Sequence, residues 1–174
     1  MKKIIFGVVA VLLIIGGVWV IKRNKKPEEK ISPEITLESS KMITDQGKLK
    51  PEMTEAEKQA IDNAFKEKGA EMTMLKDVSG GQAVGTAWRQ FDKKFYFKIE
   101  VNRLPALEKG FYYEGWLVGE PGFFSLGRMA AEAGVGKLYY SSNQDKSQFK
   151  GVVVTLEPED GNPAPDKHIL EGNF

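Results

Sequence analysis

GVVVTLEPEDGNPAPDKHILEGNF, residues 151–174, carries the clearest indication of the fold of this chain. An apolar, β-branched run at Val152–Leu156 leads directly into Glu157-Pro158, and turn-forming pairs such as Asp160-Gly161 follow. Such a run, bounded by Gly, Pro, Asn and Asp, is typical of a strand that ends in turns. We interpret this segment as the closing edge of a β-domain.

Period-two alternation marks the strands that precede this segment. Phe95, Phe97, Ile99 and Val101 alternate with polar or aromatic neighbours, which predicts a half-buried strand. Short strands spaced about 10–15 residues apart, without a helical pattern between them, are typical of a β-sandwich or barrel. We predict a mainly β fold, an antiparallel β-sandwich over residues 74–174. Further strands are expected at about residues 83–91, 112–118, 123–129, 137–141 and 149–156.

A short amphipathic helix is predicted before the β-domain, at about residues 54–68. Thr54 and Glu57 have the spacing of a capping box, and Gly69 is a suitable C-terminal stop. The helix belongs to a solvated stem at residues 27–73, which contains three prolines and little apolar periodicity before the helix. Two roles remain open for it: packing on the β-domain, or binding a partner.

The N-terminal region, residues 1–26, predicts a transmembrane anchor. Ile4–Ile21 is an uncharged run of 18 residues, and Trp19 lies near its end, where indole rings favour the membrane interface. At 1.5 Å per residue the run spans about 27 Å, close to the thickness of a bilayer core. The alternative is a cleaved signal peptide, but the run is long for one and lacks an A-x-A-like site.

The charged residues on the two sides of this anchor give no clear preference for its orientation. Lys2 and Lys3 favour an N-terminus inside the cell, whereas four basic residues after the run favour the opposite arrangement. A very short N-terminal tail before the first apolar run is usual in exported proteins. We therefore expect a single-pass protein of the cell membrane with its C-terminal domain outside the cytoplasm.

Charge and composition exclude several functional classes. Six of the 25 Lys and Arg residues lie in residues 1–26, which leaves 19 against 24 acidic residues in the rest, a net charge of about −5. An acidic domain repels phosphate, so we expect no nucleic-acid partner. The absence of cysteine removes disulfides, thiolate nucleophiles and Cys-based zinc sites.

The sequence shows no pattern of catalytic or metal-ligating residues. His168 is the only histidine, and it lies in an acidic, turn-rich segment that lacks the spacing of a metal site. Gly134–Lys137 lacks the glycine spacing and the Ser/Thr of a phosphate loop. We predict a non-enzyme without cofactor or metal, and a structural or surface role for His168.

Aromatic residues crowd the β-domain, and doublets such as Tyr112-Tyr113 place one ring on each face of a strand. Most of these rings must fill the core, but an exposed subset would mark a binding surface. The alternative is that the outer rings pack against other elements, including the predicted helix. Four residues are candidates for partner binding: Tyr112, Trp116, Phe123 and Tyr139.

Three pieces, taken in order, carry a family resemblance: NRLPAL at 102–107, YEGWLV at 113–118, and VVTLEP at 153–158 with DGNPAP at 160–165. Together they resemble the C-terminal, extracytoplasmic domain of anti-sigma-K factors, over roughly residues 75–172. The resemblance implies a β-rich module outside the membrane, tethered by one transmembrane helix to a cytoplasmic domain that holds a sigma factor. It implies no catalytic residues.

Only Met1–Lys3 precede the apolar run, so we expect the cytoplasmic sigma-binding domain to be lacking. The function expected from the sequence is a membrane-anchored binding or sensing module, regulatory through a membrane or envelope protein partner. The alternatives are an envelope ligand-binding or structural protein, or an enzyme acting on a small ligand.

Overall fold

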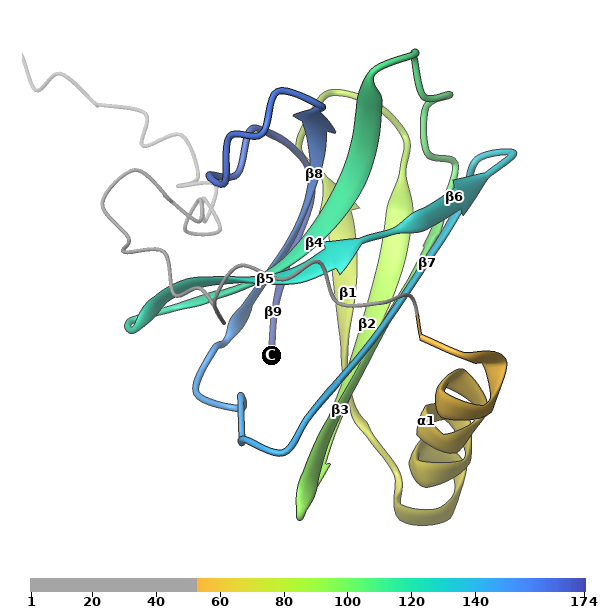
Figure 1. The fold of residues 1–174 in the computed structure, drawn as a ribbon, viewed down its shortest axis with the longest axis vertical. Coiled ribbons are helices and arrows are strands. Elements are labelled where there is room, and N and C mark those ends of the chain that lie inside the picture. The colour runs from red at the N-terminus through yellow and green to blue at the C-terminus, as the bar shows by residue number, and fades with distance from the viewer. Residues whose placement is uncertain (1–52) are drawn as a thin grey trace, which may run out of the picture. The chain divides into compact units, whose positions relative to one another are not determined.

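The computed structural model describes residues 53–174, which form one α-helix followed by nine β-strands (Figure 1). The helix, α1, spans Glu55–Lys68. The strands are β1 (Glu71–Asp77), β2 (Val84–Asp92), β3 (Lys94–Asn102), β4 (Phe111–Gly119), β5 (Gly122–Arg128), β6 (Ala130–Glu132), β7 (Val135–Ser142), β8 (Gly151–Pro158) and β9 (Lys167–Asn173). The expected transmembrane anchor lies outside the described residues. Within residues 53–174, no helix combines the length and apolarity needed to cross a membrane.

The predicted helix and its capping box are confirmed. Glu57 N donates to Thr54 Oγ1 (3.3 Å), and Thr54 N donates to Glu57 Oε2 (2.8 Å), so two free amides of the first turn gain partners. Gly69 ends the helix at φ 78°, a conformation that costs glycine little. Acidic residues in the first turn and lysines in the last turn complement the helix dipole.

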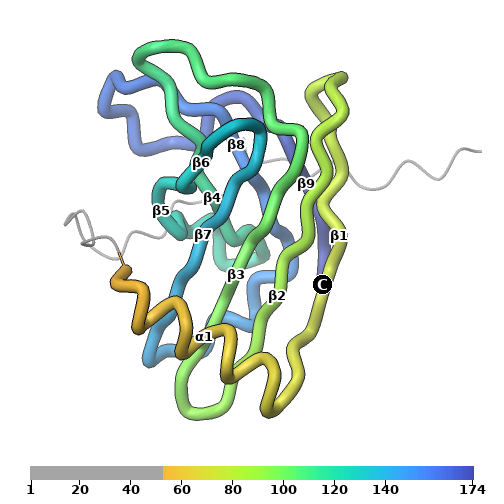
Figure 2. The backbone as a smooth tube through the Cα atoms, turned by 90° about the vertical axis from the view of Figure 1, so that its right-hand side faces the viewer, coloured from red at the N-terminus to blue at the C-terminus, as the bar shows by residue number. Residues whose placement is uncertain are grey.

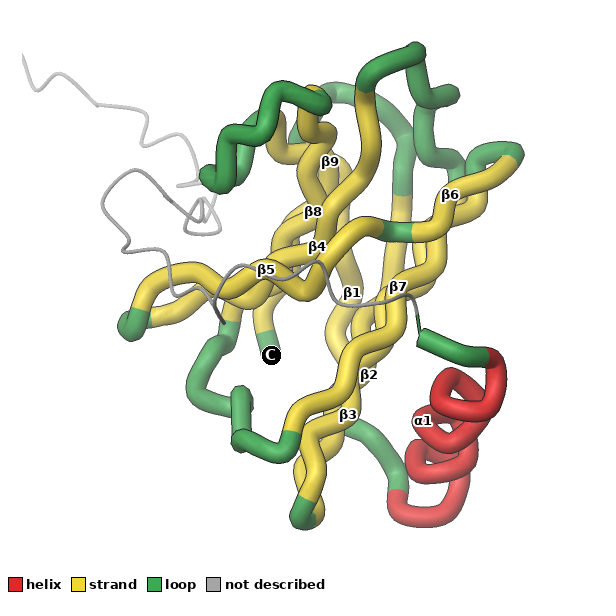
Figure 3. The backbone as a smooth tube through the Cα atoms, viewed as in Figure 1, coloured by secondary structure: helices red, strands yellow, loops and turns green. Residues whose placement is uncertain are grey.

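All nine strands belong to one antiparallel sheet, in the order β5-β4-β8-β9-β1-β2-β3-β7-β6. The sheet twists and curls until β5 comes into contact with β7, giving a nearly closed, barrel-like form (Figure 3). The predicted mainly β, antiparallel fold is confirmed. The prediction of two separate sheets, as in a sandwich, is wrong, because one continuous sheet surrounds the core.

Strand β9 is the reason for this difference. The sequence segment that contains it reads as a turn-rich tail, yet β9 pairs with β8 through Val152 and Val154 and with β1 through Lys76 and Asp77. It therefore joins β5-β4-β8 to β1-β2-β3-β7-β6, which without β9 would be two sheets facing each other.

The interior of the barrel is filled with apolar side chains. On β3, Phe95, Phe97, Ile99 and Val101 point inward, and each has 0% of its surface exposed, as the alternating pattern predicted. Gly115 of β4 lies where opposite walls approach, because a Cβ there would be 2.8 Å from Leu138 Cδ1 of β7. Burial of these side chains is the main contribution that holds the sheet closed.

The turn between β1 and β2 is held by a single carboxylate. Asp77 accepts four hydrogen bonds: from the backbone N and Oγ of Ser79 and from the backbone N of Gly81 and Ala83, at 2.8–2.9 Å. Burial raises the pKa of Asp77, but these hydrogen bonds together outweigh it and hold the pKa below its usual value. The ionised side chain thus fixes the loop that connects β1 to β2.

Candidate functional site

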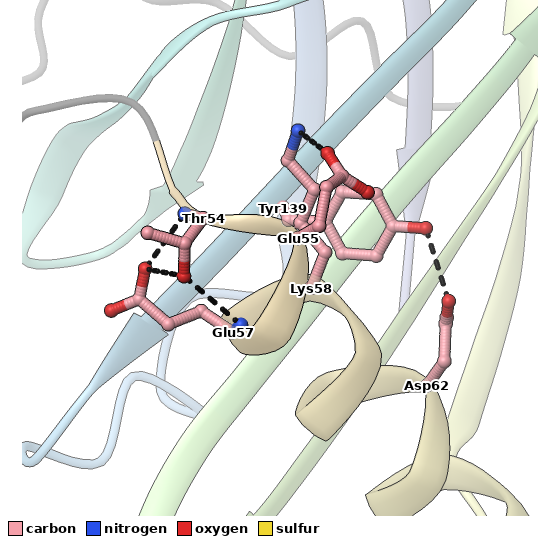
Figure 4. Close-up of polar contacts among 6 residues, drawn as sticks. All are labelled: Thr54, Glu55, Glu57, Lys58, Asp62 and Tyr139. Atoms are coloured by element: carbon pink, nitrogen blue, oxygen red, sulfur yellow. Dashed lines mark hydrogen bonds and ion pairs between the residues drawn. The ribbon is translucent and has the colours of Figure 1, made fainter.

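Helix α1 lies across the outer face of β3 and β7, as Figure 2 shows. Ile61 of the helix is fully buried on the side that faces the sheet. The Asp62 carboxylate faces the sheet, where Lys98 Nζ of β3 donates to Oδ1 (2.8 Å) and the Tyr139 hydroxyl of β7 donates to Oδ2 (3.2 Å; Figure 4). Lys68 forms an ion pair with Asp92 at the other end of the helix. One apolar and two polar attachments therefore position α1.

Lys98 is the centre of this polar cluster. Its ammonium lies 4.8 Å from the ring centroid of Trp88 and 5.8 Å from that of Tyr139, and it also pairs with Glu100 at 3.4 Å. Cation–π contacts of this kind are strengthened by partial burial, and the Lys98 side chain is only 14% exposed. Burial, together with the negative charge of Asp62, raises the pKa of Tyr139 to about 12, so its hydroxyl stays protonated and donates.

An open groove runs between α1 and the strands beside this cluster. Apolar residues provide most of its lining, and three charged residues complete it. Met72 of β1 is paired with Trp88 of β2 in the sheet, so the two side chains lie next to each other on the outer face. The complete lining is Asp62, Phe65, Lys66, Ala70, Met72, Trp88 and Lys98. The groove is open to solvent along its length, and its apolar lining suits contact with an apolar side chain of a partner.

Three of the four predicted aromatics share a second outer surface, on β4 and β5. Trp116 and Phe123 pack edge to face with ring centroids 5.9 Å apart and are 2% and 6% exposed. Trp116 Nε1 donates to Thr155 Oγ1 of β8 at 2.8 Å, a hydrogen bond between two buried groups. Both rings are therefore embedded among neighbours, and a role for them in partner binding stays a prediction.

Tyr112, the third of these aromatics, is half-buried on β4, four residues before Trp116. The Arg128 guanidinium stacks 3.7 Å from its ring centroid and also pairs with Glu159 at 3.0 Å. Burial raises the pKa of Tyr112, and the carboxylate of Glu114 adds to the effect. Tyr139, the fourth aromatic, lies instead under α1 beside the groove, so the four do not form one patch.

Glu114 is the carboxyl group most affected by its surroundings on this surface. Burial raises its pKa, although a hydrogen bond from Ser125 opposes the shift, and the nearby carboxylate of Glu157 raises it further. Glu157 is 2% exposed and accepts from the backbone N of Asp166 (2.9 Å). These contacts connect the β-strands to the loop that leads into β9.

His168 lies on β9 and is half-buried, with Nδ1 2.5 Å from Glu171 Oε1. One extra residue of β9, Ile169, stands between the partners of Val154 and Thr155 of β8, and this bulge brings the side chains of His168 and Glu171 to the same face although they are three residues apart. Across residues 53–174 there is no group of three or more His, Cys, Asp or Glu side chains placed to hold a metal ion.

The three pieces of sequence that carry the family resemblance meet in the structure. The Tyr113 hydroxyl of the second piece donates to the Pro105 carbonyl of the first at 2.9 Å. The Trp116 to Thr155 hydrogen bond joins the second piece to the third. These residues fix a loop to the barrel and β4 to β8, so the order and spacing of the pieces reflect the fold.

The chain matches the family described as "Anti-sigma-K factor rskA, C-terminal" over residues 5–169. It belongs to this family. The resemblance seen in the sequence is confirmed, and the match starts well before the β-domain, inside the apolar run at Ile4–Ile21. No curated protein and no solved structure shows significant similarity to the chain.

Sequence reasoning missed most of the groove beside α1. The predicted β-domain begins at residue 74, whereas β1 begins at Glu71 and places Met72 and Met74 on the outer face. The available signal was the alternation in EMTMLKD, in which both methionines fall on the same side of a strand. The alternation involves only two methionines with charged and polar residues around them, so it is a weak signal for a strand.

Proposed function

We propose that this member of the anti-sigma-K factor C-terminal family is a membrane-anchored regulatory module whose β-barrel domain binds a protein partner outside the cytoplasm. The observation that carries the proposal is the family match, which includes the apolar run and the β-domain in one continuous region. Anti-sigma factors are regulators that act by binding other proteins, and the proposal extends this mode of action to the present chain.

The surface that supports partner binding best is the groove between α1 and β1–β3. It combines an exposed thioether at Met72 with the face of Trp88, and both residue types are common at protein-binding surfaces. The barrel interior is filled by its own side chains, and Glu114 and His168 lie on the outside of the sheet. A surface that recognises a macromolecule fits these features better than an internal ligand cavity.

Two measurements test the proposal. Fusions of alkaline phosphatase and of green fluorescent protein to Phe174 report the side of the membrane, and we expect an active phosphatase and a dark fluorescent protein. Purification of the full chain from solubilised membranes is expected to recover one protein partner in fixed ratio. A fluorescent fusion inside the cell would refute the orientation, and repeated recovery of the chain alone would refute the regulatory role.

A further inference from the structure

An apolar strip continues from the groove along the outer face of β1 and β2. Met72 and Met74 are 60% and 65% exposed, and Val84, at the far end of the strip, is 38% exposed. The strand register places Met72 opposite Trp88, and Lys76 opposite Val84. We call these four residues, Met72, Met74, Val84 and Trp88, the β1–β2 surface. Large apolar side chains that are exposed together in this way mark interaction sites.

Two lysines stand at the ends of the β1–β2 surface, Lys66 on the rim of the groove and Lys76 at the end of β1. Neither forms an ion pair with a residue in 53–174, although Glu171 of β9 is the register partner of Lys76; Lys68 and Lys98, by contrast, are both paired. Within the described part of the chain, two ammonium groups without an ion pair therefore stand at the ends of an exposed apolar strip, in a protein that is acidic beyond residue 26.

We propose that the β1–β2 surface binds a segment of a protein partner in which apolar residues are flanked on both sides by Asp or Glu. The apolar residues cover Met72, Met74 and Trp88, and the flanking carboxylates pair with Lys66 and Lys76. Met72 to Lys76 spans about 13 Å along the strand, which corresponds to four or five residues of an extended segment or about nine of a helix. This inference rests on the proposed function and adds the chemistry of the partner.

Charge favours this occupant over a second copy of the chain. In an isologous dimer through this surface, the strips of the two copies run in opposite directions, so that Lys66 of one copy faces Lys76 of the other and like charges oppose each other. An acid-flanked segment of another protein instead brings a carboxylate to each of the two lysines.

The test uses the full chain in membranes of the source organism, with the photo-crosslinking amino acid p-benzoyl-phenylalanine in place of Met74. The expected result is one crosslinked protein whose attached peptide, sequenced by mass spectrometry, carries apolar residues flanked by acids. The substitutions Lys66→Glu and Lys76→Glu together are expected to lower the yield at least tenfold. The matched control Lys137→Glu, an exposed lysine three strands away on β7, is expected to leave it unchanged.

A crosslink to a second copy of the chain, to lipid or to a basic segment overturns the inference, as does a yield that the double substitution leaves unchanged. A parallel experiment replaces Tyr112 by the same photo-crosslinker. If Met74 captures nothing while Tyr112 captures a protein, the β1–β2 surface is wrong and the proposed function stands. If neither position captures a protein, both are wrong.

Discussion

The hydrogen bond from Trp116 to Thr155 gives the sharpest test of how this domain is held together. The substitution Thr155→Val keeps the shape of the side chain and removes the hydroxyl that accepts from the indole N–H. Trp116 is 2% exposed and Thr155 is fully buried, so water cannot replace the lost partner. A buried donor left unsatisfied costs about 1–3 kcal/mol, and we expect a loss of about 2 kcal/mol in the free energy of unfolding.

A double-mutant cycle separates this hydrogen bond from simple packing. In a Trp116→Phe background no donor remains, so the same Thr155→Val change is expected to be close to neutral. The assay is urea denaturation followed by circular dichroism, with the slope m constant across the four proteins. As a control, Thr73→Val removes an exposed hydroxyl that donates to Asn173 O (2.6 Å) and is expected to change stability by less than about 0.5 kcal/mol.

The reasoning would be refuted by an equal cost of Thr155→Val in both backgrounds, because the loss would then come from the valine itself. A larger cost in the Trp116→Phe background would also contradict it. A change in m for Thr155→Val alone would indicate that the substitution alters the folded or unfolded ensemble rather than one hydrogen bond.

Four further changes have defined outcomes. Asp77→Asn is expected to destabilise the domain by about 2 kcal/mol at pH 7, because four donors lose a charged acceptor. In the parent protein, the stability contributed by Asp77 is present above the pKa of the unfolded state and is lost as pH falls through the lowered pKa of the folded state. Urea titrations at successive pH values measure this loss. For Glu114 the pH dependence of stability has the opposite sign, because burial raises its pKa in the folded state. The parent protein therefore loses stability as pH rises from the unfolded pKa through the folded pKa. Glu114→Gln is expected to give a flatter profile of melting temperature against pH and to be at least as stable as the parent at pH 8. Thr54→Ala removes the helix cap and should lower stability by about 1 kcal/mol, while Thr54→Ser restores it; equal stability of all three would contradict the capping role. Lys98→Met deprives Asp62 of its ion pair, and hydrogen exchange should show faster exchange in α1 with little change in β8.

The sequence predicted the parts of this domain that depend on local pattern. The helix could be placed because the capping box at Thr54 and Glu57 and the stop at Gly69 are local signals, each decided within one turn. The inward face of β3 could be placed because alternation of Phe95 to Val101 leaves one arrangement that buries the rings. The family could be recognised because its short pieces contain residues, such as Trp116 and Thr155, that the fold needs at fixed positions.

The site was harder to predict, because it depends on which outer residues are left uncovered. The aromatic doublets predicted one ring on each face of a strand, but the surroundings of Tyr112 and Tyr139 were decided by distant neighbours such as Arg128 and Asp62. The most exposed large apolar side chains on the outer face of β1 are instead Met72 and Met74, which alternate over too few residues to mark a strand.

The amino-acid sequence specifies the strand faces, the helix ends, the family and the charge of the domain, since each follows from local chemistry or from composition. That a single sheet curls into a nearly closed, barrel-like form follows only from the folded chain, because it depends on β9 pairing with both β8 and the distant β1. Folding likewise brings Met72, Met74 and Lys76 of β1 and Lys66 of α1 to exposed positions on and beside one outer face. Pairings across more than ninety residues are set by the packing of the whole core, and no local pattern in the chain encodes them.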